Sequence, residues 1–155
     1  MGNSPKKIQL MFKTIFKKNI KIKKNVIISN NNKCFIVAEI SANHSGSLDL
    51  LKKTILKAKQ IGVDAVKIQT YQANTITLNT KNKHFLIDDK SIWRGKSLFD
   101  LYKSAETPFH WHNEIFKFAK KNKIICFSAP FDNSAVDLLR KNDCPIYKIA
   151  SPEIE

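Results

Sequence analysis

The sequence contains little glycine, proline, cysteine or acidic side chain. Four Gly and five Pro among 155 residues exclude a collagen-like chain and a chain dominated by flexible linkers. No run of about 18 apolar residues is present to span a bilayer, so we expect a soluble, cytoplasmic protein. The N-terminal region also lacks the apolar segment and small-residue cleavage site of a secretory signal.

The three cysteines, Cys34, Cys126 and Cys144, are odd in number and widely spaced. This pattern suits reduced thiols in a cytosol better than a disulfide scaffold. It does not match the ligand spacing of a zinc site, so no structural zinc is expected.

Basic residues outnumber acidic ones, which gives a net charge of +14, but the excess is uneven along the chain. Residues 1–33 contain nine Lys and no acidic residue, whereas the remaining 122 residues carry 18 basic and 13 acidic side chains, a net charge of +5. We therefore divide the chain into a basic N-terminal extension, residues 1–33, and a mildly basic domain, residues 34–155. Apolar residues at helical spacing over residues 4–18 predict a short amphipathic helix, within an extension that is otherwise expected to be solvated.

Strands and helices alternate from residue 26 onward. Residues 34–40 (CFIVAEI) form an almost wholly apolar run, which is typical of a strand buried on both faces of a parallel sheet. A helical pattern over residues 47–61 follows and ends at Gly62. The same reasoning predicts further strands at 26–29, 63–69, 124–128 and 146–150, and further helices at 97–105, 109–121 and 132–141.

This order of elements predicts an α/β fold with a parallel sheet. A doubly wound sheet of four strands would normally cover its last strand with a helix, but the chain stops at Glu155, just after the last predicted strand. A (β/α)8 TIM barrel needs about 250 residues. We expect the N-terminal half of such a barrel, truncated after strand 4.

Polar side chains gather near the carboxyl end of each predicted strand, where the sites of barrels and open α/β sheets lie. Small polar residues in such positions often only cap the next helix, which makes Asn43, His44 and Ser128 weaker candidates than the others. The residues at this rim are Glu39, Ser41, Asn43, His44, Lys67, Gln69, Ser128, Lys148, Ser151 and Glu153.

Lys67 and Gln69 lie two residues apart on a strand and therefore point to the same face. An unpaired lysine on an inward face would lose solvation, so it needs an anion, either a carboxylate such as Glu39 or a ligand. Lys148 repeats the arrangement on the last strand. Two inward lysines near one carboxylate leave room for a ligand that carries phosphate or carboxylate groups. The simpler alternative is an ion-pair network without a ligand.

Two other features have ordinary structural explanations. His110 and His112 resemble a metal-binding pair, but residues two apart on a helix that begins near Pro108 point to different faces. Asp132 is expected to cap the helix that follows it. The sequence has no phosphate-binding loop, no GxGxxG motif and no nucleophile elbow.

Four ordered motifs resemble the sialic acid synthase family, whose members condense phosphoenolpyruvate with an amino sugar. The resemblance covers about residues 35–155, and the Ser-Ala-Asn-His form of the first motif, with Trp93 and residues 97–112, is most similar to the pseudaminic acid synthase branch. The motifs are FIVAEISANHSG (35–46), DAVKIQTY (64–71), FSAPFD (127–132) and YKIASPEI (147–154).

The resemblance implies a homodimer in which a barrel is followed by a small antifreeze-like domain that covers the partner's site. It also implies a divalent cation, Mn²⁺ or Mg²⁺, held by two histidines of later barrel strands, so that this chain would hold no metal ligand and would be an inactive fragment. Ala129 stands where many members carry a hydroxyl residue. By motif match, Glu39 would be the catalytic acid/base, Lys67, Gln69, Lys148 and Ser151 would hold phosphoenolpyruvate, and Phe131 and Glu153 would border the sugar.

In the implied reaction, C3 of phosphoenolpyruvate attacks the sugar aldehyde, water adds at C2 and phosphate leaves by C–O cleavage, which gives a nine-carbon 2-keto acid. This interpretation expects no nucleic-acid or membrane partner. Two alternatives remain. Residues 1–33 could make the protein a basic module that binds nucleic acid or an anionic surface. A barrel aldolase could instead use Lys67 or Lys148 as a Schiff-base amine.

Overall fold

The computed structural model describes residues 19–23, 26–88 and 90–151, and the chain divides into two compact units, residues 1–35 and 36–155. The first unit contains strand β1 (Asn19–Lys23), paired antiparallel with strand β2 (Val26–Ser29). β2 confirms the strand predicted there. β1 was not predicted, although its alternation of polar and apolar residues is the usual sign of a strand. The helix predicted over residues 4–18 lies outside the described residues.

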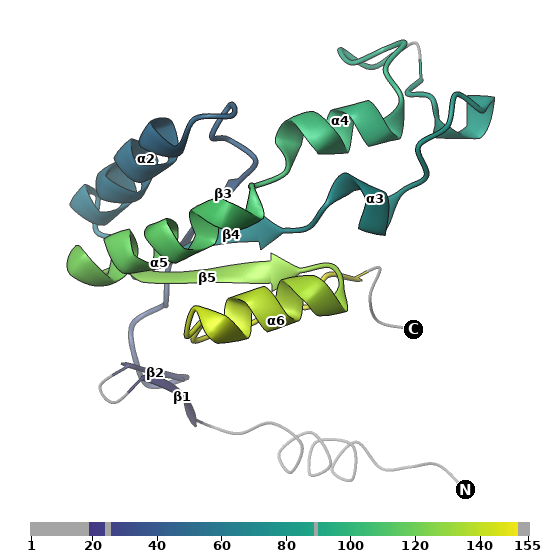
Figure 1. The fold of residues 1–155 in the computed structure, drawn as a ribbon. Coiled ribbons are helices and arrows are strands. Elements are labelled where there is room, and N and C mark those ends of the chain that lie inside the picture. Colours follow the sequence, from purple (N-terminus) through teal and green to yellow (C-terminus); the bar gives the residue numbers. More distant parts are fainter. Residues whose placement is uncertain (1–18, 24–25, 89, 152–155) are drawn as a thin grey trace, which may run out of the picture. The chain divides into compact units, whose positions relative to one another are not determined.

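The second unit is built on a three-stranded parallel sheet with helices in the connections (Figure 1). The strands lie in the order β3-β4-β5, which is also their order along the chain. The predicted α/β class with a parallel sheet is therefore confirmed. The main elements of this unit are β3 (Val37–Ser41), α2 (Leu48–Gln60), β4 (Ala65–Thr70), α5 (His112–Lys121), β5 (Ile125–Pro130) and α6 (Asn133–Lys141).

The long connection between β4 and β5 contains short helices. The helix predicted at 97–105 is present as α4 (Leu98–Ala105), whose N-cap is Ser97: the Ser97 hydroxyl accepts a hydrogen bond from the amide of Asp100. α3 packs against α4. None of the helices in the described ranges is long and apolar enough to cross a membrane. The short elements are α3 (Ala73–Ile76), η1 (Lys83–Phe85), α4 (Leu98–Ala105) and η2 (Phe109–Trp111).

The two faces of the sheet carry different side chains. Ile40 of β3, Val66 and Ile68 of β4 and Cys126 of β5 belong to one buried core cluster, together with residues of α2 and α5. Because side chains alternate along a strand, Glu39, Lys67 and Gln69 point to the opposite face. The register supports this division, since Glu39 lies opposite Lys67 on β4, and Lys67 opposite Phe127 on β5.

Two strand predictions need correction. The first strand was expected over residues 34–40 and buried on both faces, but β3 begins at Val37, and Ile36 and Glu39 are exposed. β3 is an edge strand of the described sheet and so has a backbone partner on one side only. Residues 146–150 do not form a strand: Tyr147 makes one parallel bridge with Ser128, and the described residues supply no second neighbour to extend the pairing.

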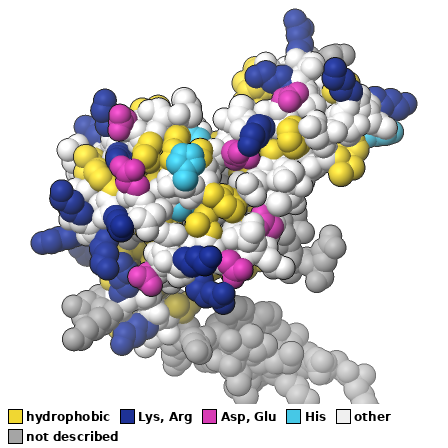
Figure 2. All heavy atoms as spheres, in the orientation of Figure 1, with side chains coloured by type: hydrophobic (Ala, Val, Ile, Leu, Met, Phe, Trp, Pro, Cys, Tyr) yellow, Lys and Arg dark blue, Asp and Glu magenta, His cyan; other side chains and the backbone are white. Residues whose placement is uncertain are grey.

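Charged side chains are interspersed on the surface of the second unit. On the face that Figure 2 shows, Lys and Arg side chains are distributed over much of the surface, some of them adjacent and others separated by acidic and uncharged groups. The modest net charge of residues 34–155 is thus spread out on this face rather than gathered into one basic patch.

A buried polar chain crosses the helix-facing side of the sheet. His112 of α5 donates from Nδ1 to the carbonyl of Pro108 (3.1 Å), and its Nε2 lies 2.8 Å from the hydroxyl of Thr70. The Thr70 hydroxyl lies 2.6 Å from that of Ser128, and the Ser128 hydroxyl also lies 3.1 Å from the carbonyl of Ile68, so its one proton serves both contacts. Burial lowers the pKa of His112, against smaller opposing effects of backbone hydrogen bonds to Pro108 and Phe109. The ring is therefore neutral, and Nε2 accepts from Thr70.

Because the imidazole of His112 is buried and neutral, we expect the free energy of unfolding to fall in mild acid. Because the pKa of His112 in the folded state lies below its ordinary value of 6.5, the unfolded chain binds more protons as the pH falls through that value. The free energy of unfolding, measured with urea, should be highest above about pH 6.5 and decline below it. Burial also lowers the pKa of His44, which adds to the same trend.

His112→Gln should reduce this pH dependence as well as the stability itself, because the titrating ring is gone. His110→Gln, at an exposed neighbouring position, is the matched control and should keep the wild-type profile. A His112→Gln profile as steep as that of the wild type would contradict the assignment.

Asp132 caps α6, as the sequence predicts. Its Oδ1 accepts from the amide of Ala135 (2.8 Å) and the hydroxyl of Ser134 (2.5 Å), while Oδ2 accepts from the hydroxyl of Thr75 (2.7 Å). Burial raises the pKa of Asp132, but these hydrogen bonds together outweigh it and hold the pKa below its usual value. The cap therefore also ties the start of α6 to the segment that follows β4.

Asp132→Ala should lower the free energy of unfolding by about 1–2 kcal/mol, because it removes an N-cap and the bond to Thr75. Asp137→Ala on the same helix is the control: its ion pair with Arg140 is exposed and should contribute less than about 0.5 kcal/mol. The free energy of unfolding of both variants is measured with urea. Equal decreases in the two variants would show that the N-cap contributes no more than an exposed ion pair.

Candidate active site

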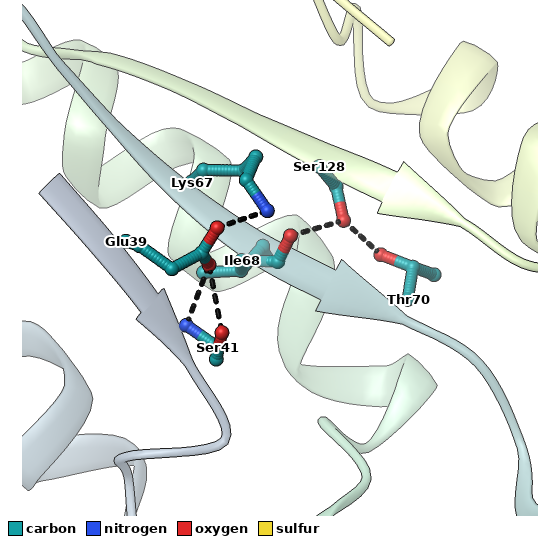
Figure 3. A network of polar contacts seen from close by, with 6 residues as sticks. All are labelled: Glu39, Ser41, Lys67, Ile68, Thr70 and Ser128. Carbon is teal, nitrogen blue, oxygen red and sulfur yellow. Dashed lines mark hydrogen bonds and ion pairs between the residues drawn. The ribbon is translucent and has the colours of Figure 1, made fainter. Parts of the chain in front are cut away.

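An ion pair between Glu39 and Lys67 lies on the sheet face opposite the helices. The two residues are register partners on adjacent parallel strands, so their long side chains meet, Lys67 Nζ with Glu39 Oε2 (Figure 3). The Lys67 side chain is only 15% exposed and the Glu39 side chain 44%. The anion that the sequence requires for an inward lysine is therefore supplied by Glu39, and the carboxylate is still open to solvent.

Ser41 holds the other oxygen of this carboxylate. Its amide and its hydroxyl both donate to Glu39 Oε1, at 3.0 and 2.9 Å. Ser41 has a φ of 49°, in the left-handed region, where a residue with a Cβ loses about 1 kcal/mol. The sequence places Ser41 at the rim but gave it no role. Its position two residues after the acid, at the end of a strand, is the signal that could have found it.

Gln69 and Phe131 lie further along the same edge. Gln69, half-buried, is the next residue of β4 on the face of Lys67 and pairs in register with Ala129. Phe131 follows β5; its amide donates to the carbonyl of Thr70 (3.2 Å), and its ring meets that of Tyr71 edge to face, with centroids 5.6 Å apart. Both residues thus lie at the carboxyl ends of the strands, as predicted.

Tyr71 is the buried centre of this aromatic group. Its ring also meets that of Tyr102 edge to face at 6.1 Å, and its hydroxyl donates to the backbone carbonyl of Tyr102 (3.4 Å). Burial, with smaller effects of Glu106 and Tyr102, raises the pKa of Tyr71 to about 12. The phenol of Tyr71 is therefore neutral. It packs against Phe131 and, through Tyr102, connects that ring to α4.

Among the last rim residues, Lys148 differs from the expectation. Lys148 was expected to point inward as a second buried lysine, but its side chain is exposed, while its amide donates to the carbonyl of Ser128 (3.1 Å). Residues 146–150 do not pair as a strand, and strand pairing is what would make their side chains alternate between the two faces of the sheet. The Lys148 side chain is therefore not forced inward. Ser151 is exposed as well. Glu153 lies outside the described residues.

The three weaker candidates do not join Glu39 and Lys67. Ser128 was expected at the rim, but it is fully buried on the helix-facing side in the chain with Thr70, because its register partner is Ile68 rather than Lys67. Asn43 is exposed, and its amide donates to the carbonyl of Ile40 (2.9 Å) in the turn after β3.

His44 has a structural role in the loop before α2. Its Nδ1 accepts from the amide of Gly46 (3.2 Å), its Nε2 lies 3.3 Å from the hydroxyl of Thr107, and Trp111 packs edge to face at 5.5 Å. Burial lowers the pKa of His44, against a smaller effect of a hydrogen bond to the backbone of Ala105. The neutral ring therefore anchors the loop after β3 to the segment before α5.

The described residues contain no group of three or more His, Cys, Asp or Glu side chains that could hold a metal ion. His110 and His112 point apart as predicted: His112 is buried in its hydrogen bonds, whereas His110 is exposed. These residues therefore do not fit a metal site by themselves.

The geometry suits recognition of an anion beside a proton-transfer group. Lys67 is a shielded cation, and Gln69 offers an amide on the same face one step along the strand. Glu39 presents an oriented carboxylate that remains partly exposed. A phosphate or carboxylate ligand could share Lys67 with Glu39, and the carboxylate could then exchange a proton with the ligand or with water.

Comparison with known proteins relates this site to a family. The NeuB family model matches residues 54–155. The chain is 46% identical over 125 residues to the pseudaminic acid synthase of Campylobacter jejuni, covering 81% of this chain and 36% of that protein. It is 45% identical over 119 residues to the pseudaminic acid synthase of Helicobacter pylori, covering 77% and 35%.

A solved structure shows a similar arrangement of elements. The N-acetylneuraminic acid synthetase of Leptospira borgpetersenii, in complex with citrate, matches with a TM-score of 0.71 and 29% identity over 88% of this chain and 42% of that one. The chain spans little more than a third of the length of the curated relatives quoted above. The match of the family model over most of the described sheet and helices, together with these identities, shows that the chain belongs to the NeuB family.

Proposed function

We propose that the whole protein condenses phosphoenolpyruvate with an N-acetylated amino sugar and releases phosphate, giving a nonulosonic acid of the pseudaminic type. The observation that carries the proposal is the ion pair of Glu39 and Lys67 on the open face of a parallel sheet. The names of the relatives, pseudaminic acid synthases at 45% and 46% identity, indicate the class of product.

We also propose that β3, β4 and β5 are the first strands of a (β/α)8 barrel. In such a barrel the face that carries Glu39 and Lys67 would become the interior. Residues 146–150, which pair through the bridge at Tyr147 in the described chain, would become the fourth strand once a further strand pairs with them, and Lys148 would then turn from its exposed position toward Lys67. Residues 1–33 would be a basic extension to a barrel domain that begins near residue 34. A covering antifreeze-like domain and a homodimer complete the proposed assembly.

The roles proposed for Glu39, Lys67, Gln69 and Phe131 follow from the positions of their side chains, whereas those of Lys148, Ser151 and Glu153 follow from the resemblance of their motif. Lys67, with Gln69, Lys148 and Ser151, would bind the phosphate and carboxylate groups of phosphoenolpyruvate, since fixed cations and amide donors suit these anions. Glu39 would be the acid/base group. Phe131, held against Tyr71, and Glu153 would border the sugar.

In the reaction, a bond forms between C3 of phosphoenolpyruvate and the aldehyde carbon of the sugar. Water then adds to C2, and phosphate leaves with its bridging oxygen. Lys67 would stabilise the negative charge of the departing phosphate. Glu39, which is held by Lys67 and by Ser41, would accept the proton that water loses when it adds to C2, or return it. Ala129, the register partner of Gln69, supplies no hydroxyl to the ligand.

A divalent cation, Mn²⁺ or Mg²⁺, is part of the proposal, but its ligands would have to come from outside the described residues.

The two alternatives receive less support. An amine that forms a Schiff base is usually activated in an apolar pocket or beside another cation, whereas Lys67 lies beside a carboxylate. A basic module would depend on residues 1–33, whereas the match to the NeuB family lies in residues 54–155, so nucleic acid and membranes are not among the proposed partners.

The whole protein should release phosphate from phosphoenolpyruvate only when an acetamido sugar and Mn²⁺ or Mg²⁺ are both present. The measurement is a phosphate assay over a panel of acetamido hexoses, with a chelator as the metal-free control. Absence of phosphate release with every acetamido sugar tested would overturn the proposal.

Lys67→Met and Glu39→Gln should each lower kcat/KM by about 100-fold or more, because one removes a fixed cation and the other the acid/base group. The matched controls are Lys52→Met and Glu114→Gln, since Lys52 and Glu114 form an ion pair of similar exposure (21% and 57%) between α2 and α5. These controls should keep nearly full activity. If the Lys52 and Glu114 variants lost as much kcat/KM as the Lys67 and Glu39 variants, the losses would reflect the removal of any ion pair and not of this site.

A further inference from the structure

The carboxylate of Glu39 is held from two directions. Oε2 meets Lys67, while Oε1 accepts from both the amide and the hydroxyl of Ser41 at 3.0 and 2.9 Å (Figure 3). Glu and Lys side chains each have several rotatable bonds, so an ion pair between them leaves the plane of the carboxylate free to turn. Two more donors on one oxygen fix that plane.

The backbone of Ser41 makes this contact possible. The register of β3 and β4 shifts between Glu39 and Ser41, so that Ser41 pairs with Ile68, and Ser41 has a φ of 49°. Glycine adopts this conformation more easily than serine does. The amide contact would survive with glycine, whereas the hydroxyl bond requires the side chain. Serine is less favourable than glycine at this left-handed position, and what it adds over glycine is the hydroxyl bond to Glu39.

We propose that Ser41 is a positioning residue that holds Glu39 in its working orientation when a ligand engages Lys67. An anion that binds Lys67 competes with Glu39 for its cation. The two donors of Ser41 do not depend on Lys67, so they keep the carboxylate in place when its ion pair is shared. Ser41 acts through Glu39 and does not itself contact the reacting atoms. Its effect on turnover rests on the proposed function, whereas its effect on Glu39 does not.

Two substitutions separate the hydroxyl from the backbone. Ser41→Ala removes the hydroxyl and keeps a Cβ in the left-handed region, whereas Ser41→Gly removes the hydroxyl and relieves the backbone. Ser45 is the matched control, because it is exposed and has nearly the same φ, 47°. Ser45→Ala and Ser45→Gly therefore reproduce the change in backbone preference without touching Glu39.

In the whole protein, Ser41→Ala and Ser41→Gly should each lower kcat about tenfold, with KM for phosphoenolpyruvate changed less than about twofold, because a hydrogen bond to a charged group is lost while Lys67 remains. The Ser45 variants should match the wild type. Ser41→Gly should unfold near the wild-type temperature, since relief of strain offsets the added freedom of the unfolded chain. A loss of rate without a loss of stability is not the signature of a merely structural residue.

A second measurement, on the 155-residue chain, does not require turnover. Three-bond couplings at the Glu39 side chain, measured by nuclear magnetic resonance, should report one rotamer in the wild type and in both Ser45 variants. They should report averaged rotamers in Ser41→Ala and Ser41→Gly.

The outcomes separate the two proposals. If the wild-type protein shows no condensation with any acetamido sugar, the proposed function fails and the couplings alone decide the role of Ser41. Unchanged couplings in the Ser41 variants would overturn the positioning role whatever the rates. A wild-type rate in both Ser41 variants, or a rate that Ser41→Gly restores and Ser41→Ala does not, would overturn it too, because strain and not the hydroxyl would then be the cause.

Discussion

A lysine on the open face of a parallel sheet needs a negative partner, and the strand register supplies one. Lys67 lies on β4 between two strands, with Glu39 opposite it on β3 and Phe127 opposite it on β5. Of these two register partners, Glu39 is the one whose charge can neutralise it. Because Glu39 is on the edge strand and remains partly exposed, this neutralisation leaves the pair accessible to a ligand. The same contact joins β3 to β4 and leaves a shielded cation at the place where we propose that an anion binds.

The sheet separates its polar groups by face. On the helix-facing side, Thr70, Ser128 and His112 satisfy one another in a buried chain of hydrogen bonds, and the lowered pKa of His112 keeps that chain uncharged. On the opposite side, the charged pair is only partly covered. Alternation along the strands produces this division, so neutral polar groups support packing on one face while the charged groups lie on the open face.

The segments at the carboxyl ends of the strands are tied to one another rather than left as independent loops. His44 connects the loop after β3 to Thr107, Tyr71 connects the end of β4 to Phe131, and Asp132 connects the start of α6 to Thr75. Each tie joins residues distant in sequence near the edge of the sheet where Glu39 and Lys67 lie. A positioned carboxylate is of use only if the surrounding segments hold their places.

The sequence by itself determined the α/β class, the positions of most helices and strands, the cap at Asp132 and the need of Lys67 for an anion. These depend on local periodicity, on capping chemistry and on the solvation of charge, all of which can be read from neighbouring residues. The tertiary structure decided what depends on pairing between distant strands. Register placed Ser128 with Ile68 on the helix-facing side and Glu39 with Lys67 on the other. The single bridge at Tyr147 left Lys148 exposed, and the left-handed turn at Ser41 brought its two donors to Glu39. Strand pairing joins residues far apart in the chain, and no local pattern specifies it.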